Sequence, residues 1–463
     1  MFESSVYISR RRRLVESMSD GLMLFLGNSE ASANYKDNTY LFRQDSTFLY
    51  FFGLDHPDMA AIIDVESGEE TIFGDDVDID DIIWMGPQPS VKDQAAGVGV
   101  ANSAPLCKLE GVLREAQAKG RKIHFLPPYR NHNKMMLNKM LGIPFDGMKE
   151  SASVEFIRGV VALRKIKEPC EIFEIDKACN LGYAMHYTAM QMMKLGMSEQ
   201  ELVGVMEGIC ASGGYMCSFP TILSQHGETM HNHRHDGILT EGKLLLIDAG
   251  CELDSHYCSD NTRTWPCSGR FTQKQAEIYS IVSAANQHVV DNARPGVSYR
   301  QMHLETSKVI IEGLSALGLV HGDVDEMVAA GVQGMFMPHG LGHNMGLDVH
   351  DMEDLGENNV GYDIDQERAK QLGLGSLRMA RILKPGYVVT DEPGIYFIPA
   401  LIEQWKKEGR NAQYINFDKL ESYYDFGGIR LEDDILITED GCRLLGSKRL
   451  PITVKDVENA MNQ

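Results

Sequence analysis

The sequence predicts a two-domain protein of the mixed α/β (α+β) class. The chain has 463 residues, which is more than one ordinary domain needs. Hydrophobic residues make up 43% of it and charged residues 24%, so the chain can bury a large core. Short apolar runs separated by turns fill the first third, whereas long helical patterns alternate with apolar strands afterwards. We therefore expect an N-terminal mixed-sheet α/β domain followed by a larger C-terminal domain.

The N-terminal domain is expected to span residues 1–164. Its apolar runs at 47–53 (TFLYFFG), 60–65 (AAIIDV) and 122–126 (KIHFL) are predicted to be strands. Residues 74–81 (GDDVDIDD) contain five Asp, but they lack the glycine and the distal glutamate of a calcium loop. This segment is therefore predicted to be a solvated turn.

The C-terminal domain, residues 165–463, is expected to begin with a long helix. Pro169 suits the first helical position, where its missing N–H costs nothing. Apolar residues follow at helical spacing, and Gly196 is predicted to end the helix. Farther along, residues 243–249 (KLLLIDA) and 435–438 are predicted to be strands.

The charge balance excludes some classes of partner. The chain has 66 acidic and 44 basic residues, a formal net charge of −22, which argues against binding to nucleic acid or to an anionic membrane. We find neither a signal peptide nor an apolar stretch of about 18 residues. The nine cysteines are scattered without a C-x-x-C pair, so a cytoplasmic location is expected. The four arginines at 10–13 are predicted to lie on a surface helix rather than to form a heparin or nuclear patch.

Several catalytic motifs are excluded by their spacing. Residues 237–244 (GILTEGKL) resemble a phosphate-binding loop, but leucine replaces the hydroxyl residue after the lysine, and a strand follows instead of a helix. Neither H-E-x-x-H nor G-x-S-x-G occurs. A serine hydrolase is therefore unsupported.

Four carboxylates stand at or near the ends of predicted strands. Asp248 ends LLLID, and Asp260 lies 12 residues later in CSDNTRTWP, so a hairpin would bring the two together. Glu392 lies in VVTDEPGIY and Glu432 in GGIRLEDDILIT, while His343 lies in a loop flanked by glycine. A carboxylate at the end of an apolar strand is costly unless it is paired or binds a cation.

These residues suggest an oxygen-rich metal site. Two metals about 3.5–4 Å apart need bridging carboxylates, which this set can supply. Hard ligands with one imidazole favour manganese, with cobalt, zinc and iron as alternatives. The alternative is that the acids belong to unrelated turns.

The same segments resemble a known family. The strings LLLIDAGCE, SDNTRTWP, MPHGLGHNMGLDVHD, TDEPGIYF and GGIRLEDD resemble the pita-bread metallopeptidase family, which includes methionine aminopeptidase, aminopeptidase P and prolidase. The resemblance covers about residues 165–455, and FRQDSTFLYFFGL resembles the N-terminal domain shared by aminopeptidase P and prolidase. It implies a pita-bread (creatinase/aminopeptidase-like) catalytic domain at 165–463.

The resemblance implies a role for each metal-site residue. It makes Asp248, Asp260, His343, Glu392 and Glu432 the ligands of two divalent metal ions, with Asp260 and Glu432 bridging them. A bridging hydroxide would be the nucleophile, because two cations lower the pKa of bound water. Glu392 would also handle the proton of that water.

Further residues are implied to bind substrate. His231 and His350 would contact the scissile carbonyl and the developing oxyanion, and His339 would line the pocket. Arg430 would orient Glu432. Arg378, in 375–386 (GSLRMARILKPG), resembles the prolidase arginine that binds the carboxylate of a dipeptide.

Three functions remain open within this resemblance. A prolidase would cleave only Xaa-Pro dipeptides, whereas an aminopeptidase P would remove the first residue of longer Xaa-Pro peptides. The segment around Arg378 and the insertion 398–425 favour prolidase, but the polar insertion 352–374 departs from the prolidase pattern. The spacing of the two aspartates is also one residue longer than usual, which suggests a bulge or a longer hairpin. An inactive binding protein on this fold is disfavoured by the complete ligand set. A small Xaa-Pro peptide is thus the expected partner, and the resemblance implies a homodimer.

Overall fold

The computed structural model describes residues 2–462 and divides into two compact units. One unit comprises Met1–Arg164 and Met352–Asn359, and the other comprises Lys165–Asp351 and Val360–Gln463. We call the first the N-terminal unit and the second, after the role that the resemblance implies for it, the catalytic unit, and we describe each by itself. No helix among the described residues is long and apolar enough to cross a membrane.

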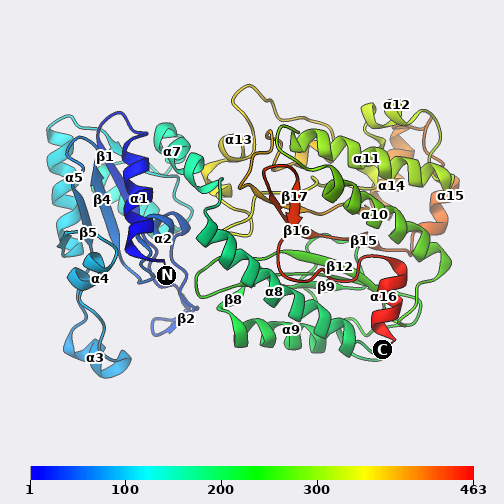
Figure 1. Cartoon of the computed structure of the whole chain (residues 1–463), viewed down its shortest axis with the longest axis horizontal. Helices are drawn as coiled ribbons and strands as arrows, with labels where there is room; N and C mark the ends of the chain where they lie inside the picture. The colour runs from blue at the N-terminus through cyan, green and yellow to red at the C-terminus, as the bar shows by residue number, and fades with distance from the viewer. Residues whose placement is uncertain (1, 463) are drawn as a thin grey trace. The chain divides into compact units, whose positions relative to one another are not determined.

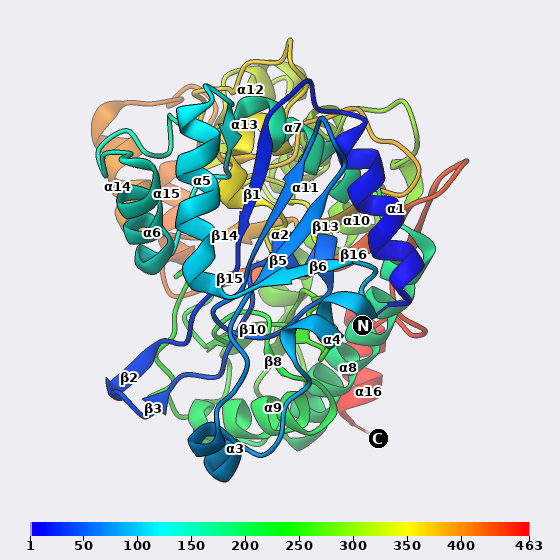
Figure 2. The ribbon, with the colours of Figure 1, turned by 90° about the vertical axis from the view of Figure 1, so that its left-hand side faces the viewer.

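The N-terminal unit is built on a five-stranded mixed sheet with the order β6-β5-β4-β1-β7. The central strand β1 pairs antiparallel with β4 and parallel with β7. Figure 2 shows strands β1 and β5 of this sheet between helices α1 (Ser4–Val15) and α5 (Leu109–Ala118). The strands are β1 (Leu22–Leu26), β4 (Ala60–Asp64), β5 (Glu70–Phe73), β6 (Asn102–Ala104) and β7 (Ile123–His124), with a separate hairpin of β2 (Ser32–Tyr35) and β3 (Asn38–Thr39). The predicted mixed-sheet α/β architecture is confirmed.

The described residues up to 164 also form seven α-helices. They are α1 (Ser4–Val15), α2 (Ser46–Phe52), α3 (Ile79–Met85), α4 (Val91–Gly97), α5 (Leu109–Ala118), α6 (Asn131–Leu141) and α7 (Val154–Arg164). Helix α3 begins inside the segment predicted to be a turn, because Asp78 and Asp81 form a capping box at its N-terminus.

The predicted strand at 47–53 is wrong, because this segment forms helix α2. The side chain of Asp45 accepts a hydrogen bond from the N–H of Phe48, and Gly53 ends the helix in the left-handed conformation with φ of 63°. All seven residues of the helix are buried. A short run that is apolar on every side has no periodicity that separates a buried helix from a buried strand.

The prediction of a surface arginine cluster at 10–13 is also wrong for two of its members. Arg10 and Arg11 are buried in helix α1, with exposures of 1% and 0%. The guanidinium of Arg10 lies 3.8 Å from the centre of the Tyr50 ring and donates to the Tyr50 carbonyl. Arg11 donates to Glu70 and to the carbonyl of Phe51. Helix α1 therefore uses two arginines to satisfy buried acceptors.

The catalytic unit contains two pairs of long helices. Helix α8 (Pro169–Met192) packs against α9 (Glu199–Gly213), and α10 (Gln273–Asn292) packs against α11 (Tyr299–Ala316). Figure 1 shows strands of this unit between the two pairs. Pro169 begins α8 as predicted, but the helix ends at Met192, before Gly196, which forms part of the following turn with φ of 86°.

The strands of the catalytic unit form small antiparallel sheets. The two largest have the orders β12-β10-β9 and β13-β16-β17, and β14-β15 and β11-β8 form pairs. An isolated bridge between Thr262 and Glu432 connects β12 to the segment before β16. The strands are β8 (Met216–Cys217), β9 (Ile222–Ser224), β10 (Leu244–Ala249), β11 (Cys251–Glu252), β12 (Asn261–Pro266), β13 (Val388–Asp391), β14 (Gly394–Tyr396), β15 (Gly428–Arg430), β16 (Asp433–Ile437) and β17 (Cys442–Leu444).

The two helix pairs repeat one local design. The second helix of each pair is capped by a serine, Ser198 in one pair and Ser298 in the other. Each serine also forms an isolated antiparallel bridge, Ser198 with Ile238 and Ser298 with Ile382.

The later part of the chain also contains shorter α-helices. They are α12 (Val324–Ala329), α13 (Glu357–Val360), α14 (Pro399–Glu408), α15 (Phe417–Leu420) and α16 (Val454–Met461).

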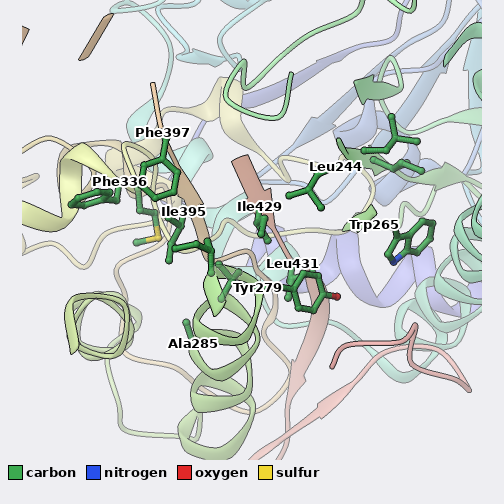
Figure 3. Packing of buried hydrophobic residues seen from close by; sticks show 14 of the residues in the cluster. Leu244, Trp265, Tyr279, Ala285, Phe336, Ile395, Phe397, Ile429 and Leu431 are labelled. Atoms are coloured by element: carbon green, nitrogen blue, oxygen red, sulfur yellow. The ribbon is translucent and has the colours of Figure 1, made fainter. Parts of the chain in front are cut away.

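A large apolar core supports the strand ends of the catalytic unit. Figure 3 shows part of it, in which side chains of β10, β12, α10, β14 and β15 pack together. Trp265, Tyr279, Ile395 and Ile429 are all fully buried. Burial of this much apolar surface, at about 25 cal/mol per Å², holds the strands rigidly and fixes the positions of side chains at their ends.

Candidate metal centre

Four carboxylates lie at the ends of two antiparallel strand pairs. Asp248 is the penultimate residue of β10, and Asp260 directly precedes β12, with which β10 pairs. Glu392 directly follows β13, and Glu432 directly precedes β16, with which β13 pairs. The predicted hairpin between the two aspartates is confirmed, and the residues between them include the short strand β11.

Three of the predicted ligands converge closely. Each of the three buried residues Asp260, His343 and Glu432 offers one ligand atom, and these atoms lie within 4.8 Å of one another. His343 Nε2 lies 3.4 Å from Asp260 Oδ2 and 3.7 Å from Glu392 Oε1. Glu392 is therefore the fourth member of the group.

Asp248 is joined to this group through a buried arginine. The guanidinium of Arg430 donates to Asp248 Oδ2, and its Nε donates to Thr262 Oγ1 over 3.1 Å. Thr262 in turn donates to Glu432 Oε2 over 2.7 Å. Arg430 is thus connected to Glu432 only through Thr262, whereas it contacts Asp248 directly, and its predicted role in orienting Glu432 stays a prediction.

The carboxylates repel one another, and the charge of Arg430 offsets this repulsion only in part. Burial, followed by the charges of Asp248, Asp434 and Glu392, raises the pKa of Asp260 well above its usual range. Burial and the neighbouring carboxylates likewise raise the pKa of Glu432, and burial raises that of Glu392. Oδ1 of Asp248 and Oδ1 of Asp260 are buried without a hydrogen-bond partner.

This donor set fits divalent metal ions. Buried anions that share a site need a cation to offset their desolvation and repulsion. Oxygen donors with a single imidazole suit manganese, zinc, cobalt or iron, and carboxylates can bridge two of them. The unpartnered oxygens of Asp248 and Asp260 are open donor atoms for such ions.

The orientation of His343 also suits a ligand. Its Nδ1 lies 3.0 Å from the carbonyl oxygen of Asn344, so Nδ1 carries the proton and Nε2 presents its lone pair towards Asp260. Thr390 holds the backbone of His343, accepting from its N–H at Oγ1 and donating its own N–H to its carbonyl. The ring is thus fixed from two sides.

Two of the predicted substrate histidines lie beside this group. The ring centre of His350 is 4.1 Å from that of His343. His339 Nδ1 lies 3.7 Å from Glu392 Oε2, and its Nε2 lies 2.9 Å from the hydroxyl of Tyr396. Burial, reinforced by Arg430, lowers the pKa of His339 to about 3, so this imidazole is neutral at physiological pH.

The other two predicted substrate residues lie farther out. His231 is an exposed loop residue. Partial burial lowers the pKa of His231, and the negative charge of Asp248 opposes this. Arg378 is half-buried, and its charge adds to the lowering of the pKa of His231 and His339 by burial. The same charge opposes the rise that burial causes in the pKa of Glu392. Arg378 is therefore within electrostatic range of the carboxylate group.

Sequence reasoning missed three residues that hold the group together. Tyr396 is fully buried, and its hydroxyl accepts from Arg430 Nη1 over 2.8 Å and contacts His339. Thr262 and Thr390 are buried in β12 and β13. Only Thr390 gave a signal, because it is a hydroxyl residue after the apolar run Val388–Val389 of β13, and such a group is costly to bury without a partner.

Two family models match the chain. Residues 174–439 match metallopeptidase family M24, and residues 7–124 match the N-terminal domain of aminopeptidase P. The chain belongs to metallopeptidase family M24. The expected pita-bread architecture with its preceding N-terminal domain is thereby confirmed, as is a metallo-exopeptidase class of enzyme.

Relatives of this M24 chain carry two kinds of name. The Xaa-Pro dipeptidase of Homo sapiens is 31% identical, over 99% of this chain and 93% of the relative. A probable Xaa-Pro aminopeptidase of Metarhizium robertsii is 30% identical, over 93% of this chain and 88% of the relative. Aminopeptidase P of Escherichia coli with the inhibitor Pro-Leu has a TM-score of 0.81 at 28% identity, covering 100% of this chain and 98% of that one.

Proposed function

We propose that this chain is a dinuclear metal-dependent exopeptidase that hydrolyses the Xaa-Pro peptide bond. The observation that carries the proposal is the convergence of Asp260, His343, Glu392 and Glu432, with Asp248 joined to them through Arg430. The names of the relatives, Xaa-Pro dipeptidase and Xaa-Pro aminopeptidase, support the substrate class. Two manganese ions are the proposed cofactors, with cobalt, zinc or iron as alternatives.

The proposed chemistry divides between the metal ions and the protein. Two divalent cations in such a site lower the pKa of bound water and polarise the scissile carbonyl. Glu392, at the open side of the group, takes the proton of the attacking water and delivers it to the leaving nitrogen. His231 and His350 donate hydrogen bonds to the carbonyl oxygen as its negative charge develops. Neutral His339, held by Tyr396, lines the pocket beside Glu392.

The proposed substrate has no N–H at the scissile bond that the site could contact. The bond before proline is a tertiary amide without an N–H, and the ring restricts the preceding residue. Recognition must therefore depend on the carbonyl, on the free amino terminus and, for a dipeptide, on the proline carboxylate. A dimetal centre can serve the first two.

Arg378 is proposed to make the enzyme a dipeptidase. A guanidinium near Glu392 and His339 can bind the proline carboxylate of an Xaa-Pro dipeptide in a bidentate manner. The second candidate is an Xaa-Pro aminopeptidase, which the names of the Metarhizium relative and of the Escherichia coli structures support.

A comparison of substrates separates these two candidates. We expect Ala-Pro to be cleaved with a kcat/KM at least about tenfold above that of Ala-Pro-Ala, since only the dipeptide places a carboxylate at Arg378. Arg378→Ala should raise the KM for Ala-Pro much more than that for Ala-Pro-Ala. Arg368→Ala, an exposed arginine of the same segment, is the control. If the tripeptide is cleaved as well or better, the aminopeptidase proposal replaces the dipeptidase proposal.

The number of metal ions is tested separately. Elemental analysis of manganese-supplemented, desalted protein should give two ions per chain for the wild type and fewer for Asp260→Asn, because Asp260 is proposed to bridge both. A wild-type protein that retains one ion with full activity would contradict the dinuclear centre.

Three further assignments belong to the proposal. We assign residues 1–164 to the N-terminal domain and 165–463 to the catalytic domain, which agrees with the first division between the compact units. The net charge of −22 supports the absence of nucleic-acid and membrane partners. A homodimer and a cytoplasmic location are proposed from the resemblance and from the composition, respectively.

A further inference from the structure

A buried ion pair lies directly beside His350. Lys167 Nζ is 2.8 Å from Asp351 Oδ2, and the two side chains are only 2% and 1% exposed. A pair this deep gains little net stability, because the loss of hydration offsets the attraction, but removing one partner leaves a buried charge unpaired. Asp351 is the residue that follows His350 in the chain.

Asp351 closes the loop that carries His350. Its N–H donates to the carbonyl of Asn344 over 2.9 Å, and its Oδ1 accepts from the N–H of Asp348 over 3.3 Å. Gly346 lies tightly against the pair, since a Cβ there would be 2.8 Å from Asp351 Oδ2 and 2.9 Å from Lys167 Nζ. The loop from 344 to 351 therefore wraps around the ion pair.

Lys167 is anchored independently of that loop. Its N–H donates to the carbonyl of Gly386 over 2.7 Å, and it directly precedes Glu168, the N-cap of helix α8. The lysine thus extends its ammonium from the fixed start of a long helix. Movement of Asp351 away from this ammonium would break the buried ion pair that ties the loop to the start of the helix.

We propose that Lys167 and Asp351 are positioning residues that hold the imidazole of His350 beside His343. The ring centres of the two histidines are 4.1 Å apart, so a small shift of the loop would move His350 relative to the metal ligand. Neither Lys167 nor Asp351 is proposed to touch the substrate. The inference rests on the proposed function, because the role of His350 in binding the developing oxyanion is taken from it.

A double-mutant cycle with His350 tests the inference in the manganese-loaded full chain. Lys167→Met should lower kcat for Ala-Pro about 10–100-fold, with KM changed less than about threefold, as expected when support for an oxyanion contact is lost. In the His350→Ala background the same substitution should change kcat less than about threefold. An equal loss in both backgrounds would overturn the proposal, since Lys167 would then act independently of His350.

Controls separate positioning from general stability. Arg443→Met breaks the ion pair of Arg443 with Asp176, 2.7 Å apart in the same unit, and should leave kcat within about twofold. If Lys167→Met does not fold, Lys167→Arg keeps the charge but places a larger guanidinium against Gly346. It should lower kcat about 3–10-fold, and only when His350 is present.

A second readout does not depend on catalysis. The imidazole NMR signals of His350, assigned by comparison with His350→Ala, should move in Lys167→Arg and stay in place in Arg443→Met. Unmoved signals would overturn the positioning role. Failure of the wild type to hydrolyse Ala-Pro or Ala-Pro-Ala would instead contradict the proposed function, and it would leave the NMR result to decide whether the pair positions the ring.

Discussion

Two neighbouring acids at the start of β16, Glu432 and Asp433, have opposite surroundings. Asp433 lies between two arginines, with Arg263 Nη2 at 2.6 Å and Arg449 Nη2 at 2.9 Å. Burial alone would raise the pKa of Asp433, but the charges of Arg263 and Arg449 lower it below its usual range. For Glu432, burial and the charges of Asp260 and Glu392 raise the pKa far above its usual range.

The neighbours of a buried acid distinguish one with a structural role from one that can bind a cation. Both residues are buried, with exposures of 2% and 5%. Asp433 receives its countercharge from the protein, whereas Glu432 faces other carboxylates and the neutral hydroxyl of Thr262. Alternation along the strand sends the two side chains to opposite faces. Burial of an acid alone does not indicate a metal site; at Glu432, burial coincides with several neighbouring carboxylates whose repulsion the charge of Arg430 offsets only in part.

The largest expected effect comes from neutralising each acid in turn. Glu432→Gln should abolish hydrolysis of Ala-Pro, by at least about 10³-fold, because it removes a proposed bridging ligand. It should leave the stability of the metal-free protein unchanged or higher, since one repelling charge is lost.

Asp433→Asn should have the opposite effects: it should lower stability and leave the metal site intact. It leaves Arg263 and Arg449 without their carboxylate partner and should destabilise the metal-free protein by about 3 kcal/mol. Metal content should remain at that of the wild type. Denaturant unfolding of both variants after chelation measures the contrast, and equal destabilisation by the two substitutions would count against it.

The next largest effect on metal binding is expected from Arg430, because its guanidinium donates to the proposed ligand Asp248. Arg430→Lys keeps the charge but cannot reach Asp248, Thr262 and Tyr396 together. We expect manganese affinity and kcat to fall about 10–100-fold. Calorimetric titration of manganese into the variant checks this, with Arg443→Lys as the control. Unchanged affinity would show that Asp248 needs no orienting partner.

A smaller effect is expected in the N-terminal unit, where Asp64 pairs with Arg121. Hydrogen bonds from Arg121 lower the pKa of Asp64 below its usual range, although partial burial opposes this. A carboxyl with a depressed pKa stabilises the fold above its unfolded pKa of about 3.9 and loses that contribution as the pH falls. Asp64→Asn should therefore cost about 1 kcal/mol at pH 7, and the deficit should shrink below about pH 4.

Thermal unfolding of wild type and Asp64→Asn between pH 7 and pH 2.5 measures this dependence. A deficit that is constant with pH would mean that the ion pair is not its source. Hydrolysis of Ala-Pro at pH 7 should be the same in both proteins.

Much of the metal site could be predicted from the sequence, because its ligands are charged residues that stand at the ends of strongly apolar runs. Asp248 after LLLI and Glu392 after VVTD stand out as costly residues, and family motifs add His343. The roles of Tyr396 and Thr262 could not be predicted, because they depend on contacts between strands far apart in the sequence. Their side chains are ordinary for buried strands.

Secondary structure could be predicted where the hydrophobic periodicity is clear, and the predictions were wrong where it is not. Helix α8 and strand β10 follow their patterns, whereas the segment of α2 is apolar on all sides, so its sequence predicts a strand where a helix forms. The burial of Arg10 and Arg11 depends on carbonyls of α2 and on Glu70, which no local pattern reveals. Tertiary context decides such cases.

The central claim is that the strand-end carboxylates hold metal ions that hydrolyse Xaa-Pro bonds. Its most direct test is the hydrolysis of Ala-Pro by manganese-supplemented wild-type protein beside Asp260→Asn, Glu432→Gln and Asp433→Asn. We predict turnover by the wild type and by any folded Asp433→Asn protein, loss of turnover on chelation, and none with Asp260→Asn or Glu432→Gln. Full hydrolysis by either of these last two variants would contradict the account.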